Sequence, residues 1–293
     1  MNRLKCFMLF ALLGLSQLLM ASESGESLFK YPQVPDTIST LDKRANYFVS
    51  NFWENLDLTK QIKDKEAFKA AFVDYITFFP YADGKVVENS LNKLLYKTQG
   101  NSSNFRLLAE SAELAFYGAN PVMKSDGTYH YILTKIVASN RLSTTEKLRY
   151  QTQINILFNN RLGVEAQEFK YKNLAGRSKK FGKFDSDYTI LYINDPDCED
   201  CVIGRLRLSV DVELNRLIEQ GKVTFYSISL CEYSKEWAEK AKEYSKTWEI
   251  GATSEIFDLY DLRLTPNLYI MDKDGVILAK NVAKISDILS IVK

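Results

Sequence analysis

The sequence contains few of the residues on which many metal-dependent and histidine-dependent enzymes rely. It has one histidine and four cysteines in 293 residues. The histidine, His130, has no metal-ligating residue three or four positions further on, so we interpret it as structural. A zinc site would need a fourth ligand beside the cysteines, and the sequence places none near them. We therefore expect no metal and no cofactor.

An excess of charge of either sign is also missing. Lys and Arg number 38 and Asp and Glu number 37. This balance provides no basic field of the kind that nucleic acids or acidic lipids attract, so we expect no nucleic-acid partner. We interpret the short basic run at 177–180 as a solvated turn.

Near the N-terminus, the apolar stretch is too short to span a bilayer. Asn2, Arg3 and Lys5 precede apolar residues that reach Ala21, fewer than the ~20 that a membrane helix needs. Basic residues, a short apolar core and a small residue at its end are typical of a secretory signal peptide. We predict that residues 1–21 are removed as a signal peptide. The mature chain is then expected to be exported to the periplasm, without stable membrane insertion. Disulfides persist in such a compartment.

Residues 22–162 show the periodicity of helices. Apolar residues recur at i, i+3, i+4 and i+7, as in Phe68, Phe72, Tyr75 and Phe79, which predicts an all-α domain of about five helices. Its many aromatic residues have two interpretations, a buried core or a groove for a partner. The expected helices include 86–96, 105–117, 129–138 and 145–158.

From residue 163 to 293 the pattern changes to alternating strands and helices. Strands are expected near Phe169, at 188–194 and at 223–230, with helices at 202–218 and 234–248. After Pro266, two further strands at 268–271 and 276–279 are joined by a turn that ends in Gly275, which is typical of a hairpin. The order predicts an α/β domain whose sheet is mixed and covered on both faces.

Cys198 and Cys201 form a CxxC pair at the junction between an expected strand and an expected helix. In thiol–disulfide exchange a thiolate attacks a disulfide, and a second cysteine resolves the mixed disulfide that forms. The first residue of such a pair lies at the helix N-terminus, where the helix dipole stabilises a thiolate, and the second lies three positions on, within bonding reach. This chemistry predicts Cys198 as the nucleophile and Cys201 as the resolving thiol.

Several segments resemble one known family, the exported TlpA-like thiol-disulfide oxidoreductases. They are the run 163–169, the CxxC pair, Thr265 with Pro266, and the hairpin 268–280. The resemblance implies a thioredoxin-like fold over residues 163–293, a cis Pro266, and a backbone at Thr265 and Pro266 on which a substrate segment pairs as a strand. The region around 31–58 resembles an uncharacterised helical domain found ahead of such modules, and no activity comes with that resemblance.

The residues around the pair depart from the family pattern. Asp197 stands where the family often has Trp, Asn194 where it often has an aromatic residue, and Tyr192 where many thioredoxins bury an acid. Asp197, Glu199 and Asp200 flank the pair, together with Asp195. One carboxylate at ~7 Å costs a thiolate about 0.6 kcal/mol in water and about 2.4 kcal/mol at a dielectric of 20. A helix N-terminus returns only about 0.3 to 1 kcal/mol, so we predict a weakly acidified Cys198 and a reducing to intermediate couple.

The sequence therefore leaves two candidate functions open. The first is thiol–disulfide exchange on exported proteins or thiols, of the reductase or isomerase type, with an unidentified redox partner. The second is a non-catalytic thioredoxin-fold module with a structural Cys198–Cys201 disulfide, in which the helical domain binds the partner. Cys231 has two interpretations as well: a buried bystander or a third exchanging cysteine.

Overall fold

The computed structural model describes residues 28–118 and 120–293. The predicted signal peptide, residues 1–21, lies outside the described residues. By their contacts the residues divide into two compact units, the first formed by Met1–Phe116 with Val122–Lys124 and the second by Tyr117–Pro121 with Ser125–Lys293. No helix in the described part of the chain is long and apolar enough to cross a membrane.

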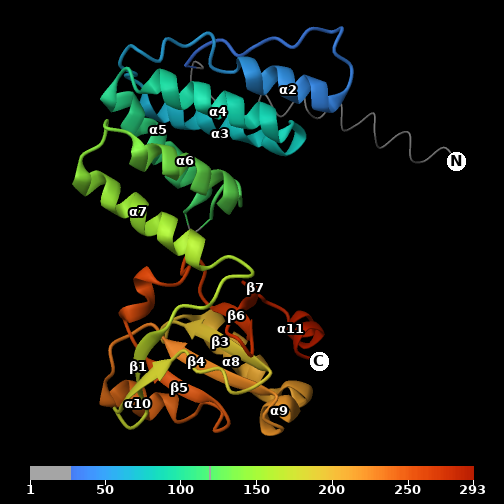
Figure 1. Cartoon of the computed structure of the whole chain (residues 1–293), viewed down its shortest axis with the longest axis vertical. Helices are drawn as coiled ribbons and strands as arrows, with labels where there is room; N and C mark the ends of the chain where they lie inside the picture. Colours follow the sequence, from blue (N-terminus) through green and yellow to red (C-terminus); the bar gives the residue numbers. More distant parts are fainter. Residues whose placement is uncertain (1–27, 119) are drawn as a thin grey trace, which may run out of the picture. The chain divides into compact units, whose positions relative to one another are not determined.

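The first unit is helical, as its periodicity predicts (Figure 1). Its core is aromatic: Phe52, Phe68, Phe72 and Tyr75 are fully buried, and Tyr75 donates a hydrogen bond to Ser90. These contacts support the core interpretation of the aromatic residues. The elements are α2 (Leu41–Asn51), α3 (Lys65–Thr77), the 3-10 helix η1 (Phe79–Tyr81), α4 (Gly84–Thr98) and α5 (Ser102–Phe116).

The second unit begins with two helices, α6 (Asp126–Ala138) and α7 (Thr144–Asn159). Ser143 caps α7 in a capping box with Glu146, which fixes its first turn. The sequence predicts that the helical domain ends at residue 162, and this boundary stays a prediction. The contacts group α6 and α7 with the sheet that follows.

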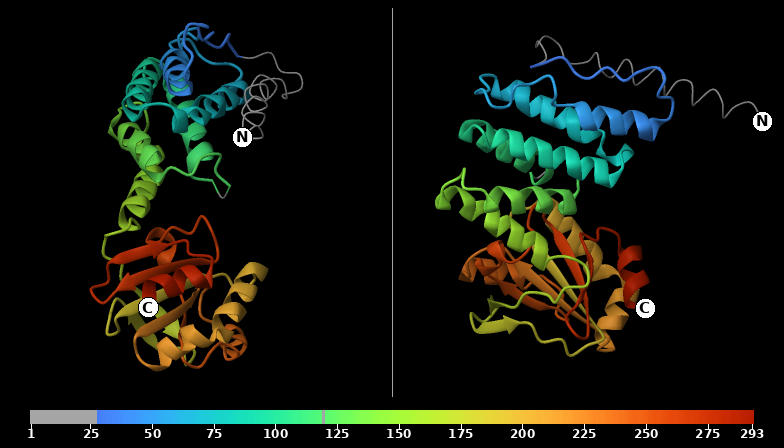
Figure 2. Two further views of the ribbon diagram at one scale, coloured as in Figure 1. Left: turned by 90° about the vertical axis from the view of Figure 1, so that its right-hand side faces the viewer. Right: turned by 45° about the horizontal axis from the view of Figure 1, so that its top comes forward.

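The second unit also contains a mixed seven-stranded sheet in the order β2-β1-β5-β4-β3-β6-β7. Figure 1 labels its strands except β2, and Figure 2 gives two further views. The strand β3, which lies inside the sheet, pairs in parallel with β4 and antiparallel with β6. This is the predicted thioredoxin-like α/β architecture. The strands are β1 (Phe169–Asn173), β2 (Ser178–Phe181), β3 (Tyr188–Asn194), β4 (Val223–Ser229), β5 (Glu249–Ala252), β6 (Asn267–Asp272) and β7 (Ile277–Lys280).

Both faces of the sheet are buried, but by different elements. Leu208, Leu214, Trp237 and Ile288 bring four helices to one face. Ile256, Tyr260 and neighbouring residues of the segment after β5 cover the other face. The helices are α8 (Glu199–Val210), α9 (Val212–Glu219), α10 (Lys235–Ala241) and α11 (Ile285–Val292), and the covering segment includes the 3-10 helix η2 (Glu255–Asp258).

Three local predictions in this unit are wrong. The basic run at 177–180 continues into strand β2 and does not form a turn. Because β2 is an exposed edge strand, its residues lack the apolar alternation by which a strand is predicted. The helix expected at 234–248 ends at Ala241, and the chain then forms β5. The helix expected at 202–218 breaks at Asp211, whose extended backbone ends α8 and whose side chain caps α9.

Candidate redox site

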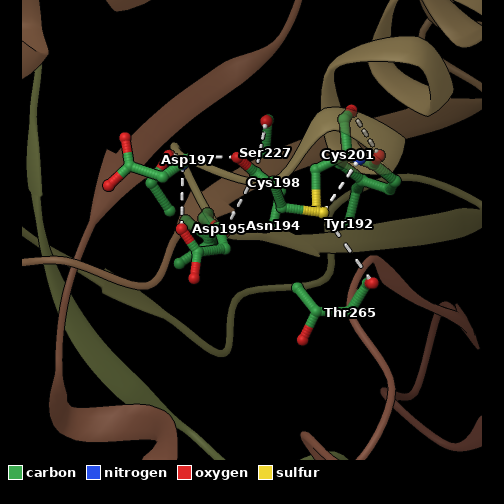
Figure 3. Close-up of a disulfide and its surroundings, with 10 residues drawn as sticks. Tyr192, Asn194, Asp195, Asp197, Cys198, Cys201, Ser227 and Thr265 are labelled. Atoms are coloured by element: carbon green, nitrogen blue, oxygen red, sulfur yellow. Dashed lines mark hydrogen bonds between the residues drawn. A yellow bond between two sulfur atoms is a disulfide. The ribbon is translucent and has the colours of Figure 1, made fainter.

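Cys198 and Cys201 are joined by a disulfide at the junction of β3 and α8 (Figure 3), with their Cα atoms 5.2 Å apart. Cys198 is the N-cap of α8, and its sulfur accepts a hydrogen bond of 3.1 Å from the backbone N–H of Cys201. Cys201 is fully buried, whereas Cys198 is partly exposed. Because Cys201 is fully buried, Cys198 is the cysteine of the pair that an incoming thiol or disulfide would attack or meet.

Thr265 and Pro266 lie beside the disulfide although they are more than sixty residues further along the chain. The pairing of β6 with β3 brings them there, since β6 begins at Asn267. The Thr265–Pro266 peptide bond is cis, and the carbonyl oxygen of Thr265 lies 3.9 Å from the sulfur of Cys198. The structure thus brings together the four residues that the sequence predicts for exchange and substrate binding.

The acidic residues around the pair lie on its solvent side. Asp197, Glu199 and Asp200 are exposed. A side-chain oxygen of Asp195 accepts a hydrogen bond from the backbone of Asp197, and the carbonyl of Asp195 accepts one from the N–H of Cys198. The acids therefore shape the turn before α8, and solvent partly screens their charge from a thiolate.

Tyr192 fills the place where the family pattern leads one to expect a buried acid. Its hydroxyl donates a hydrogen bond of 2.9 Å to the backbone carbonyl of Cys201, in a buried position on β3. Burial raises the pKa of Tyr192 to about 12. At neutral pH the phenol stays protonated, so it holds the first turn of α8 in place and accepts no proton.

A buried polar network beneath the site was not predicted from the sequence. Asn194 is fully buried, and its amide donates to Ser227 and to the carbonyl of Ile228. Ser229 donates to the amide oxygen of Asn194. The network joins the ends of β3 and β4, and so fixes the strand end from which the cysteine turn departs. Polar residues at the ends of two apolar runs were the signal in the sequence that would have located it.

Comparisons with known proteins agree with this geometry. Residues 16–160 match DUF5106, a domain of unknown function. A thioredoxin-like protein from Bacteroides caccae is 25% identical, with a TM-score of 0.69 over 92% of this chain and 99% of that chain. The chain thus matches the DUF5106 model over 16–160, and the residues that follow have a thioredoxin-like fold. No curated protein matches it.

Two further solved structures resemble a part of the chain. The C-terminal domain of an uncharacterised protein from Bacteroides fragilis is 30% identical, with a TM-score of 0.43 over 46% of this chain and 98% of that one. A domain of a possible thiol-disulfide isomerase from Cytophaga hutchinsonii is 24% identical, with a TM-score of 0.39 over 45% of this chain and 92% of that one.

A groove of about 450 Å³ opens next to the disulfide in the thioredoxin-like domain. Three segments form its walls: α8, the cis-proline loop and the turn between β7 and α11. Asp200 and Arg207 are the charged residues of its lining, and apolar side chains form most of the rest. Its lining includes Ile203 of α8, Pro266 of the cis-proline loop, and Asn281 and Val282 of the turn after β7.

The exposed surface of α8 is also more apolar than the sequence led us to expect. In an unbroken helix over 202–218, Ile203, Leu206 and Val210 share one apolar stripe with Leu214 and Leu217, which predicts that they are buried. In the structure they are 39%, 57% and 74% exposed. Because the helix ends at Asp211, only Leu208 of α8 reaches the core as a fully buried apolar side chain, and the other three face solvent. We call these three residues the α8 face. Ile203 belongs to both the α8 face and the groove.

Cys231 is a free cysteine that follows β4 and is partly buried. Burial, reinforced by the negative charges of Asp195, Glu232 and Asp197, raises the pKa of Cys231 to about 11. The thiolate, which is the reactive form, is therefore scarce at neutral pH. These properties favour the bystander interpretation.

We expect iodoacetamide at pH 7.5 to modify Cys231 about a hundredfold more slowly than an ordinary exposed thiol, because a rise of two pKa units removes about 99% of the thiolate. Mass spectrometry of the reduced protein over time would measure this rate, with the same protein in denaturant as the unprotected control. Modification of Cys231 at the denatured rate would contradict the prediction.

Proposed function

We propose that the protein catalyses thiol–disulfide exchange on exported proteins in the periplasm, as a reductase or isomerase. One observation carries the proposal: a partly exposed Cys198, capping a helix, is bonded to a fully buried Cys201 and lies next to the Thr265 carbonyl before a cis proline. A purely structural disulfide has no need of an exposed sulfur or of a neighbouring backbone on which a substrate segment pairs.

Starting from the reduced protein, the exchange takes two steps. The Cys198 thiolate attacks one sulfur of a substrate disulfide, and the other substrate sulfur leaves as a thiolate that takes up a proton. Cys201 then loses its proton, and its thiolate attacks the sulfur of Cys198. The second substrate thiol is released, the substrate has gained two electrons, and the protein is left with the Cys198–Cys201 disulfide. A thiol or dithiol redox partner restores the reduced form.

The surroundings of Cys198 support a polypeptide as the substrate. The carbonyl of Thr265 lies beside the Cys198 sulfur and gives an extended segment a backbone acceptor there. The groove and the α8 face, which share Ile203, supply adjoining apolar contacts. Exposed apolar patches next to a reactive group are typical of surfaces that bind other proteins. The helix N-terminus stabilises a Cys198 thiolate, while the four nearby carboxylates oppose it.

Because the nearby carboxylates offset the stabilisation of a thiolate by the helix N-terminus, we expect the Cys198–Cys201 couple to have a reduction potential between about −270 and −180 mV, the range between thioredoxin and protein disulfide isomerase. A titration against glutathione, read by mass spectrometry after acid quenching, would measure it. The same preparation should reduce insulin disulfides in the presence of a dithiol.

Two results would count against parts of this proposal. A potential near about −120 mV would show that the acidic residues do not hold Cys198 near its ordinary acidity. A disulfide that resists glutathione in a protein that leaves insulin untouched would reject exchange and favour a structural disulfide in a binding module.

A further inference from the structure

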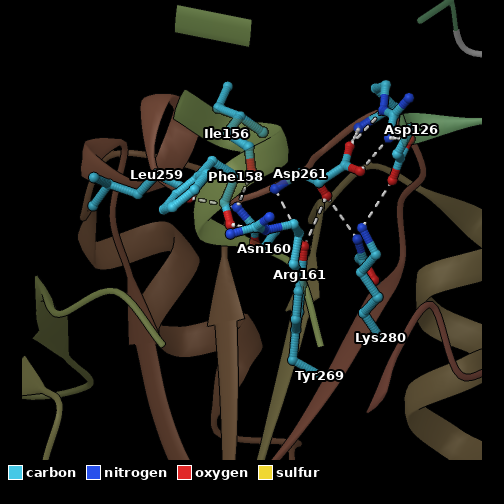
Figure 4. Close-up of polar contacts among 11 residues, drawn as sticks. Asp126, Ile156, Phe158, Asn160, Arg161, Leu259, Asp261, Tyr269 and Lys280 are labelled. Carbon is cyan, nitrogen blue, oxygen red and sulfur yellow. Dashed lines mark hydrogen bonds and ion pairs between the residues drawn. The ribbon is translucent and has the colours of Figure 1, made fainter. Parts of the chain in front are cut away.

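Asp126 links the last helices of the DUF5106 region to both walls of the redox groove. It is the first residue of α6, and its carboxylate accepts a hydrogen bond of 2.8 Å from Arg263 and one of 3.0 Å from Lys280 (Figure 4 labels Asp126 and Lys280). The side chains of Arg263 and Lys280 are only 16% and 17% exposed. The side chain of Asp126 is 38% exposed, so solvent screens these ion pairs in part, but less than it screens pairs in which both partners are exposed.

Arg263 in turn holds the loop that presents the cis proline. Its guanidinium binds both oxygens of Asp261, whose side chain is 4% exposed. The backbone carbonyl of Asp261 accepts a hydrogen bond from the side chain of Asn267, the first residue of β6. The loop between Asp261 and Asn267 is therefore closed at both ends, and Thr265 lies within it. Arg263 also stacks over the ring of Tyr117, 4.7 Å from its centroid.

A second anchor from the same helices holds the start of this segment. Asn160, the C-cap of α7, is fully buried, and its amide donates to the carbonyl of Leu259 and to that of Ile156 (Figure 4). Leu259 lies two residues before Asp261. The ends of α6 and α7 thus fix the chain from Leu259 to Arg263 at two points.

Lys280 extends the same arrangement to the opposite wall of the groove. It is the last residue of β7, and the next residue, Asn281, has a positive φ of 58° and lines the groove together with Val282. Asn tolerates this left-handed conformation better than most residues. One carboxylate on α6 therefore ties both the cis-proline loop and the turn after β7.

From this geometry we infer that Asp126 and Arg263 are positioning residues of the redox site: the α6–α7 segment sets the place of the Thr265 carbonyl relative to Cys198. The inference rests on the proposed exchange activity. It gives this part of the DUF5106 region a role in shaping the substrate-binding groove, in addition to any partner that the region binds.

The ionisation of Asp126 is consistent with this role. Burial tends to raise the pKa of Asp126, but the hydrogen bonds and positive charges of Arg263 and Lys280 outweigh burial and hold it below its ordinary range. The carboxylate therefore stays charged and paired at every pH at which exchange would be assayed.

The test compares Asp126→Asn, Arg263→Lys and Asp126→Glu in the full mature chain. The probe is a peptide that contains one disulfide, and the readouts are kcat and KM for its reduction and the rate of alkylation of reduced Cys198 by iodoacetamide. Asp126→Asn and Arg263→Lys should each raise KM about tenfold and change kcat little, because they displace the Thr265 carbonyl. Alkylation needs only the thiolate and should stay unchanged. Asp126→Glu should recover part of the lost affinity.

Glu66→Gln is the matched control. Glu66 also lies in the first turn of a helix and pairs with a lysine, Lys69, but it is 82% exposed and far from the second unit in sequence. It should leave every readout at the wild-type value. If Asp126→Asn does not fold, Arg263→Lys decides the same question, since it keeps the charge and loses only the forked contacts.

The outcomes separate this inference from the proposed function. A wild-type protein that reduces no disulfide rejects the proposed function. An active wild-type protein whose KM is unchanged in Arg263→Lys, or in a folded Asp126→Asn, rejects the positioning role. The double variant Asp126→Asn with Arg263→Lys supports the positioning role if its KM is no higher than that of either single variant, because the two residues then act through one contact.

Discussion

Replacing Cys198 with serine is expected to abolish reduction of protein disulfides, a loss of roughly three orders of magnitude or more, as when other enzymes lose their nucleophile. A serine hydroxyl is not ionised near neutral pH and does not attack a disulfide, and the buried Cys201 is not accessible to a substrate. The turbidity assay for insulin reduction would measure the loss. Cys231→Ser is the matched control and should keep the wild-type rate.

Cys201→Ser should give the complementary result. Its Cys198 is still able to attack, but no thiol resolves the mixed disulfide, so a covalent complex with a peptide accumulates in a one-to-one ratio. Non-reducing mass spectrometry would detect that complex. A bridge between Cys198 and Cys231 in this variant would instead establish Cys231 as a third exchanging cysteine. Unaltered turnover in Cys198→Ser would contradict the assignment of the nucleophile.

Replacing Gly204 with alanine is expected to destabilise the thioredoxin-like domain by about 1 to 3 kcal/mol, the range of an overpacked core. A Cβ at this position on α8 would lie 2.6 Å from the hydroxyl oxygen of Tyr192. That hydroxyl is buried and bound to the carbonyl of Cys201, so it has little freedom to move. The alanine would push the phenol away from the turn that holds the disulfide.

A double-mutant cycle separates this clash from the general effect of alanine in a helix. Tyr192→Phe should cost about 1 kcal/mol for the lost hydrogen bond. In that background Gly204→Ala should become neutral or stabilising by up to about 1 kcal/mol, because the clash is gone and alanine favours the helix. Gly127→Ala on α6, where a Cβ meets nothing within 4 Å, is the control substitution. Urea unfolding would measure each value, and additive effects of Gly204→Ala and Tyr192→Phe would contradict the predicted contact.

Local pattern was sufficient for much of the fold and for the identity of the redox pair. Apolar spacing located most of the helices, since a helix shows its buried face within two turns of sequence. Short apolar runs located β3, β4 and β6, the hairpin turn that ends in Gly275 located β7, and the CxxC pair was placed at a strand-to-helix junction. Local pattern failed for β2 and β5, which have four residues each, too few to show a period.

The face of α8 was predicted wrongly because the break at Asp211 was missed. An unbroken helix from 202 to 218 would have carried one apolar stripe. The break gives α8 and α9 separate orientations, so Leu214 and Leu217 are buried while Leu206 and Val210 are exposed. A single residue with an extended backbone thus changed which side chains are available to a partner.

By itself, the sequence determined that a pair of cysteines lies at the start of a helix in an α/β domain, because both features depend on residues within a few positions of each other. The tertiary structure alone decided that Cys201 is buried and Cys198 only partly exposed, that Thr265 lies beside the Cys198 sulfur, and that Asp126 ties α6 to the loop that carries Thr265. These contacts join residues far apart in the chain. They depend on strand pairing and helix packing, which no local pattern of residues records.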